Sequence, residues 1–265
     1  MGMQSSNPIL SRYEPKKGAK AATAGSANPP STFDTVVDGG GARMTINDVI
    51  IKTGAVFAVT VIFAVFGWNL AVSSPWIIFV GLIGGFALAM ANSFMRKVNP
   101  ILVLLYGAFE GLMLGGISNW YNAYAESSKY HGVVLQAVVA TMVTFGIMLA
   151  LYLTGVIKVT RKFVSIMIVA MVSYLVLGIA SLIAALFGVG GGWGFYGVGG
   201  IGLIICVVGV LIAAFFLLLD FEAINQGIKQ GVPERESWRM AFGLMVTLVW
   251  LYLEFLRMLA IFSRN

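Results

Sequence analysis

Long apolar stretches separated by short polar segments dominate the chain after residue 48. A helix needs about 20 apolar residues to cross the roughly 30 Å hydrocarbon core of a bilayer. The stretches that satisfy this requirement cover residues 50–72, 75–95, 99–119, 133–156, 162–188, 198–220 and 240–262. The pattern therefore predicts an all-α membrane protein with seven transmembrane helices.

Local sequence signals support several of the helix starts. Thr45 and Asp48 have the spacing of a capping box, in which each side chain binds the backbone N–H of the other residue. Pro75 and Pro100 stand where the second and third helices begin, and the first turn of a helix does not need the N–H that proline lacks.

Residues 1–44 have a different composition, rich in Ser, Ala, Gly and Pro and poor in large apolar residues. Such a segment cannot bury enough apolar surface to offset the entropy of folding. We therefore expect a disordered, basic cytoplasmic tail over residues 1–44 and a seven-helix transmembrane domain over residues 45–265.

The overall composition excludes a soluble domain. Hydrophobic residues make up 59% of the chain and charged residues 11%, whereas a soluble domain has about 25% charged residues. The net charge of +6 comes from basic residues beside the apolar segments, where they orient helices in a membrane, so we expect no nucleic-acid partner. Cys206, the single cysteine, lies in an apolar run and provides neither a disulfide nor a metal cluster.

The distribution of basic residues predicts the orientation. All Lys and Arg residues except Lys129, Arg257 and Arg264 fall on the side of the tail. By the positive-inside rule the N-terminus is then cytoplasmic, and after seven spans the C-terminus lies outside. The outer loops carry His131, interpreted as an ordinary exposed histidine, and aromatic residues expected at the headgroup level: Trp120, Tyr121, Tyr124, Trp193 and Tyr196.

A few acidic residues lie within the spans, where charged groups are expensive and usually face the interior of a helix bundle. Glu110 lies in the third span, Asp220 and Glu222 close the sixth, and Glu254 lies with Arg257 deep in the seventh. Glu222 is interpreted as marking the water boundary at the end of the sixth helix.

Glu254 allows two interpretations. Because Glu254 and Arg257 are three residues apart and share a helix face, they could neutralise each other in a purely structural ion pair. Alternatively, Glu254 could meet a carboxylate on the sixth helix. Two acids close together in a low dielectric hold one proton between them, and such a pair responds to pH near neutrality.

Four stretches resemble the bacterial branch of the transmembrane Bax-inhibitor-motif family: "FMRK", "YGAFEGLMLGGIS", "LLLDFEAINQGIKQG" and "LVWLYLEFLRMLAIF". The resemblance covers residues 45–262. It implies a bundle in which the seventh helix is enclosed by the other six, in the cytoplasmic membrane of a bacterium.

The resemblance also implies a function, a passive pH-sensitive calcium leak gated by an acidic pair. By motif, Asp220 corresponds to the acid of the sixth helix and Glu254 to that of the seventh. Arg96 matches the basic residue that latches the sixth-helix acid, and Lys97 is the second candidate. Calcium prefers six to eight oxygen ligands, so two carboxylates would bind it only weakly and transiently, as a permeating ion requires.

Two departures from the family pattern affect the pair. The seventh-helix acid is glutamate where the family usually has aspartate, and the segment between the acids is about ten residues longer. Straight helices that turn at Gly231–Pro233 would place the two acids at depths about 15 Å apart. The pair forms only if the seventh helix enters the membrane near Gly243, with "PERESWRMAF" as a cytoplasmic cap.

Other function classes remain open. A regulatory protein could bind a protease or an assembly partner through the tail, because disordered basic segments commonly recruit partners. A proton-coupled transporter could use the same acids as a relay. An enzyme is not expected, because there is no GxGD aspartate and His131 lies outside the spans. We expect no soluble cofactor.

Overall fold

A computed structural model describes residues 42–263, and the predicted tail up to residue 41 lies outside the described residues. Within this part, the transmembrane helices are α1 (Ile46–Ser73), α2 (Ile77–Phe94), α3 (Pro100–Ser127), α4 (Val133–Leu153), α5 (Arg161–Leu186), α6 (Gly199–Gln230) and α7 (Ser237–Phe262). All seven are long and apolar enough to cross a membrane, which confirms the predicted spans. Short 3₁₀ turns, η3 (Val189–Gly192), η4 (Gly194–Gly197) and η5 (Glu234–Glu236), lie in two of the connections.

Two helices continue well beyond the boundaries predicted from hydropathy. α3 ends at Ser127 instead of residue 119, and α6 ends at Gln230 instead of residue 220. Both extensions are amphipathic: Phe221, Ile224 and Gly227 are buried at helical spacing while polar residues between them face outward. A hydropathy average detects the apolar span and misses such a continuation. The capping box of Thr45 and Asp48 is present as predicted.

Glycines of α3 bring α1 into backbone contact. A methyl group placed at Gly111 or Gly115 would collide with the facing backbone of α1, at the carbonyl groups of residues 60 and 64, and one at Gly107 would lie only 3.2 Å from the carbonyl oxygen of residue 56. Small residues at this spacing allow two membrane helices to approach closely without a hydrophobic driving force between them. α1 and α3 therefore pack closely together, and α2 packs against α3.

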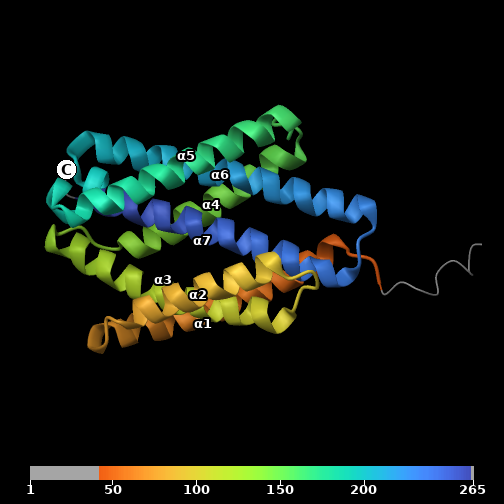
Figure 1. Cartoon of the computed structure of the whole chain (residues 1–265), viewed down its shortest axis with the longest axis horizontal. Coiled ribbons are helices and arrows are strands. Elements are labelled where there is room, and N and C mark those ends of the chain that lie inside the picture. Colours follow the sequence, from red (N-terminus) through yellow and green to blue (C-terminus); the bar gives the residue numbers. More distant parts are fainter. Residues whose placement is uncertain (1–41, 264–265) are drawn as a thin grey trace, which may run out of the picture. The chain divides into compact units, whose positions relative to one another are not determined.

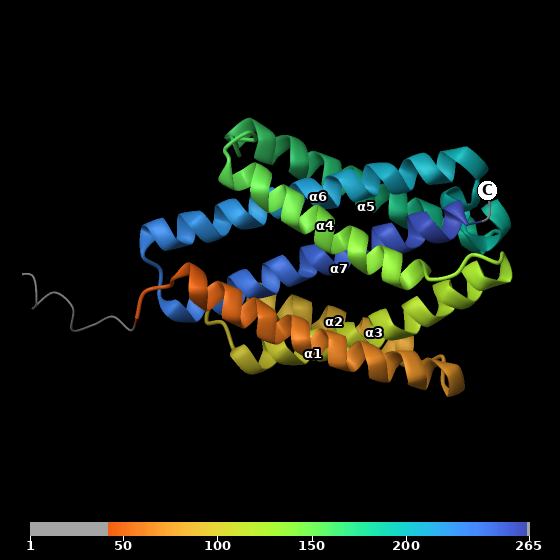
Figure 2. The ribbon, with the colours of Figure 1, turned by 180° about the vertical axis from the view of Figure 1, so that it is seen from behind.

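α7 runs through the middle of the bundle. It contacts α1 and α3 on one side and α4 and α6 on the other, and Figures 1 and 2 show it between a layer of α1–α3 and a layer of α4–α6. Along its length α7 buries residues on more than one face, including Leu251, Leu256 and Ala260, which have no exposed surface. The predicted central position of the seventh helix is confirmed.

The α6–α7 connection is attached to the first described residues. The Met44 N–H donates to the Val232 carbonyl at 2.9 Å and the Glu234 N–H donates to the Ala42 carbonyl at 2.7 Å, around a β-bridge between Arg43 and Pro233. These bonds join the beginning of α1 to the turn between α6 and α7.

Side chains tie the same connection to neighbouring elements. Lys52 of α1 pairs with Glu234 at 2.8 Å, Arg235 donates to the Val98 carbonyl at 2.8 Å, and Arg239 donates to the carbonyls of the α2–α3 loop. We call this end of the bundle, with the α2–α3, α4–α5 and α6–α7 connections, the basic end. The contacts hold the start of α7 in place and so set its depth relative to α6.

The other end of the bundle is the aromatic end. Here Trp120, Tyr121 and Tyr124 of α3 pack against Trp193 between η3 and η4, with ring centroids 4.6–5.8 Å from that of Trp193. The residues predicted to sit in loops at the headgroup level thus lie largely on the extended α3, and they join it to the α5–α6 connection.

Candidate functional site

Polar residues form a stripe along the α6-facing side of α7. Gly243, Thr247, Trp250, Glu254 and Arg257 alternate three and four residues apart, which places them on one helix face. This α7 stripe runs from the basic end, at Gly243, toward the aromatic end, at Arg257. Its residues meet side chains of α5 and α6 rather than lipid.

Glu254 is almost fully buried, with 2% of its surface exposed, and its carboxylate has a complete set of donors. Arg257 Nη1 lies 3.3 and 3.2 Å from the two carboxylate oxygens, Tyr174 of α5 donates to Oε2 at 2.8 Å, and Trp250 Nε1 donates to Oε1 at 3.1 Å. The structure therefore forms the Glu254–Arg257 ion pair, one of the two predicted alternatives.

Tyrosines extend this network toward the aromatic end. The Tyr196 hydroxyl donates to the Tyr174 hydroxyl at 3.2 Å, and the Arg257 guanidinium lies 4.6 Å from the centroid of the Tyr196 ring. Tyr121 of α3 forms a further hydrogen bond with Arg257. The ion pair is thus held by residues of α3, α5, α7 and the η4 turn.

An open cavity of about 370 Å³ lies outside this network at the aromatic end. Its walls are the glycines of η3 and η4 together with Tyr124, Trp193, Tyr196 and Ile261. Tyr196 is therefore shared between the cavity and the buried ion pair. The glycine-rich segment of η3 and η4 forms one wall of this cavity.

Asp220 lies at the other end of the α7 stripe. It hydrogen-bonds with Thr247, whose hydroxyl is also 3.4 Å from the Gly243 carbonyl. The second oxygen, Oδ2, is enclosed and has no hydrogen-bond partner. An enclosed carboxylate oxygen without a donor is unusual and marks a position that a cation or a proton could occupy.

The structure does not bring Asp220 and Glu254 together. Glu254 and Tyr174 pack against Gly209 of α6, where a methyl group would collide with both side chains. Gly209 and Asp220 are separated by about 16 Å along α6 at roughly 1.5 Å per residue. The direct acidic pair is therefore not formed, because α6 is continuous to Gln230 and the chain turns at Gly231–Pro233. α7 is a continuous helix from Ser237 onward, so most of the segment expected as a cap before Gly243 is its first turns.

The latch predicted at the end of the second helix is also not formed. Arg96 and Lys97 are exposed in the α2–α3 loop, and neither side chain has an ion pair or a hydrogen bond within residues 42–263. The backbone carbonyl of Arg96 accepts a hydrogen bond from Arg239 at 3.1 Å, but its side chain does not contribute to this contact. The loop faces the α6–α7 connection at the basic end rather than Asp220 inside the bundle.

The two secondary acids have different surroundings. Glu110 lies between α3 and α2, beside Gly85, with a hydrogen bond from Tyr106 and one enclosed oxygen, Oε2, without a partner. Glu222 lies inside the extended α6, where it accepts bonds from Tyr152 at 2.8 Å and Gln226 at 2.6 Å. The prediction that Glu222 marks the end of the helix is wrong, since α6 continues to Gln230.

Several residues of the site were missed by reasoning from sequence. The three-and-four spacing from 243 to 257 was visible in the chain and would have added Thr247 and Trp250 to the α7 stripe. Tyr174, Tyr196 and Gly209 carry no such signal, because their role depends on how α5 and α6 pack against α7. Among the described residues there is no group of three or more His, Cys, Asp or Glu side chains that could hold a metal ion.

Comparison with known proteins agrees with the architecture. A search of curated proteins found no match. The family model described as "Bax inhibitor 1 like" matches residues 7–264, which include all seven helices and the α7 stripe. The chain therefore belongs to the Bax inhibitor 1-like family of membrane proteins.

Proposed function

We propose that this protein is a passive, pH-sensitive calcium leak whose pathway follows the α7 stripe. The family is associated with calcium leak. The observation that carries the proposal for this chain is the row of polar groups through the bundle, from the aromatic-end cavity past Tyr196 and Glu254 to the unpartnered oxygen of Asp220. In this proposal the basic end faces the cytoplasm.

Separate carboxylates suit permeation better than a shared site would. Calcium prefers six to eight oxygen ligands, whereas Glu254 on the α7 stripe and Asp220 of α6 at its end each offer a single carboxylate. Binding at each position is therefore weak, which allows an ion to leave toward the next position. Asp220 and Glu254 act as two successive weak binding sites for the ion, not as one shared site.

The described conformation corresponds to a closed leak. Arg257 neutralises Glu254, and the Trp250 side chain that donates to Glu254 also packs against Phe216 of α6, with ring centroids 5.7 Å apart. A cation that entered from the aromatic end would meet a positive charge and then an aromatic side chain. Opening requires that Arg257 leave the carboxylate or that α6 and α7 separate at Trp250.

The sign of the pH dependence follows from the groups that face each acid. Glu254 faces Arg257, Tyr174 and Trp250, which compensate its charge. Asp220 faces Thr247, so its protonation removes a cation ligand without exposing a new charge. Protonation of Asp220 therefore disfavours a cation, and the leak is expected to increase as the pH rises.

The test is calcium flux into dye-loaded proteoliposomes between pH 6 and pH 8. Asp220→Asn should lower the flux and flatten its pH dependence, and Glu254→Gln should lower the flux because the Arg257 charge is then unneutralised. Glu222→Gln is the matched control, because it makes the same change on α6 at a carboxylate bonded to Tyr152 and Gln226, away from the α7 stripe. Flux equal in all four proteins, or no flux in the wild type, would refute the proposal.

A second candidate function rests on the attachment of the chain's first described residues. Because Ala42 and Met44 bond to the α6–α7 connection, a partner bound to the preceding tail would act directly on the start of α7. A regulatory protein of this kind would lose partner binding when residues 1–41 are removed. The leak, by contrast, should persist in that variant, so one deletion separates the two functions.

A further inference from the structure

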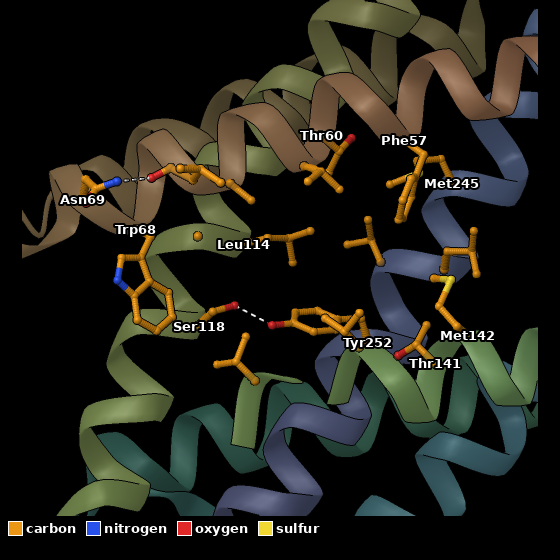
Figure 3. A pocket seen from close by; sticks show the side chains of 18 residues that line it. Phe57, Thr60, Trp68, Asn69, Leu114, Ser118, Thr141, Met142, Met245 and Tyr252 are labelled. Atoms are coloured by element: carbon orange, nitrogen blue, oxygen red, sulfur yellow. Dashed lines mark hydrogen bonds between the residues drawn. The ribbon is translucent and has the colours of Figure 1, made fainter. Parts of the chain in front are cut away.

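A second cavity, of about 480 Å³, lies between α1 and α4. Val61 and Val65 of α1, Leu114 of α3, Val138 and Met142 of α4 and Met245 of α7 line it, with other residues of the same helices. Figure 3 shows these side chains converging on a common space, with Trp68 and Asn69 at one end and Phe57, Met142 and Met245 at the other. We call this cavity the α1–α4 groove.

The α1–α4 groove and the α7 stripe lie on opposite faces of α7. The groove is lined by Met245, Leu248, Val249 and Tyr252 of that helix. At 3.6 residues per turn, these positions lie on average about 190° around the axis from the stripe residues. The groove is thus separate from the pathway proposed for calcium.

The groove is reached from the side of the bundle. Val61, Val65 and Val138 line it and are also exposed on the outer surface, at 46%, 58% and 39%. These residues lie within transmembrane helices, so the medium outside the opening is hydrocarbon. An occupant enters from the bilayer, not from water.

The hydroxyl groups that line the groove need no bound water. Its hydroxyls bond within the protein: Thr60 donates to the Val56 carbonyl at 3.0 Å, Thr141 donates to the Ala137 carbonyl at 2.7 Å, and Ser118 and Tyr252 bond to each other at 2.6 Å. A bound water needs two to four polar partners, and these groups are already satisfied. The chemistry of the lining therefore selects an apolar occupant.

The dimensions match one leaflet of a bilayer. From Phe57 to Asn69 the groove follows α1 for about 18 Å at roughly 1.5 Å per residue. One leaflet contributes about 15 Å of hydrocarbon, half of the 30 Å core. Trp68 and Asn69 lie near the end of α1 at Ser73, where a tryptophan is expected at the headgroup level.

The volume of the α1–α4 groove suits a small occupant. At about 480 Å³ it lies within the range of small-ligand sites. A single flexible hydrocarbon chain is the apolar group of the membrane that is both long and narrow enough.

We propose that the α1–α4 groove holds one acyl chain of a membrane phospholipid, with its headgroup beside Trp68 and Asn69. The bound chain fills the space between α1 and α4 and supports the face of α7 opposite the α7 stripe. This site does not depend on the calcium proposal, because binding is measured without flux.

The test is native mass spectrometry of the full chain after reconstitution in dioleoylphosphatidylglycerol vesicles and extraction into a mild detergent. The wild type should retain one phospholipid per chain. Val138→Trp and Val61→Trp fill the groove from α4 and from α1, and each should lower the retained fraction at least fivefold. Val139→Trp and Ile62→Trp are the matched controls, because these residues are 52% and 54% exposed and do not line the groove.

A measurement on the wild type needs no filling variant. After extraction from vesicles of acyl-brominated phospholipid, a retained chain should quench the Trp68 emission, obtained as the difference between the wild type and Trp68→Phe. Absent retention, equal retention in lining and control variants, or unquenched Trp68 would each overturn the proposal. So would a dimer that the lining variants dissociate, because the occupant would then be a second copy of the chain.

Discussion

Glu254 and Asp220 are both carboxylates at the α6–α7 interface, yet their surroundings differ. Glu254 has an ion pair and donors from Tyr174 and Trp250, so its charge is compensated on every side. Asp220 has Thr247 on one oxygen and no partner on the other. A compensated charge holds helices together, whereas an uncompensated one destabilises the bundle and is retained for what it can bind.

Removing the counter-charge of Glu254 should have the largest effect on stability. Arg257→Met leaves a buried carboxylate without its cation and should lower the free energy of unfolding by about 3 kcal/mol. Thermal unfolding in detergent measures the loss. The double variant Glu254→Gln/Arg257→Met should recover part of it, because the unpaired charge is then absent. If the double variant instead loses as much stability as the two single variants together, the ion pair is not the stabilising interaction.

Gly209 tests whether close packing around Glu254 is required. A methyl group at this position would collide with the Tyr174 hydroxyl and the Glu254 carboxylate, so Gly209→Ala should destabilise the protein by about 2 kcal/mol through overpacking. Gly178→Ala of α5 is the matched control, since nothing lies within 4 Å of its added methyl group. Similar unfolding temperatures for the two variants would contradict the described contact.

Two hydroxyl deletions compare the ends of the α7 stripe directly. Tyr174→Phe removes a hydrogen bond to a charged, fully buried group and should destabilise by about 1.5 kcal/mol or more. Thr247→Val removes the bond to Asp220, which is less completely enclosed, and should destabilise by about 1 kcal/mol. Thermal unfolding shows which of the two variants is less stable. A larger destabilisation by Thr247→Val would contradict the view that Glu254 is the more tightly held carboxylate.

Asp220→Asn should have the smallest effect on stability. It therefore separates the role of Asp220 from that of Glu254 most clearly. Removing a charge that is poorly compensated should change the free energy of unfolding by less than about 1 kcal/mol, while calcium flux falls. Glu254→Gln should lower both stability and flux. A variant of Asp220 that unfolds at a much lower temperature would instead show that this carboxylate is structural.

Prediction from sequence succeeded where the determinants are local. The spans follow from runs of apolar residues, and the start of α1 follows from the capping box of Thr45 and Asp48. The three-residue spacing of Glu254 and Arg257 made their ion pair one of two alternatives, and the structure forms it. Each depends on residues within one helix, whose geometry is the same in any fold.

Prediction was less successful where two helices had to be placed against each other. The expected contact of Asp220 with Glu254 depended on where the turn between α6 and α7 falls. Because α6 extends to Gln230 and α7 begins at Ser237, both helices are long and continuous, and the acids lie at different depths. Hydropathy could not show this, because those residues lie beyond the apolar span.

The sequence by itself determined the seven membrane helices, the family and the polar composition of α7, because these follow from residue type and from spacing along one chain segment. The tertiary structure alone decided that Glu254 faces Gly209 and Tyr174, that Asp220 faces Thr247, and that a lateral groove remains between α1 and α4. The reason is that relative helix depth is set by contacts at the basic end, between segments far apart in the chain.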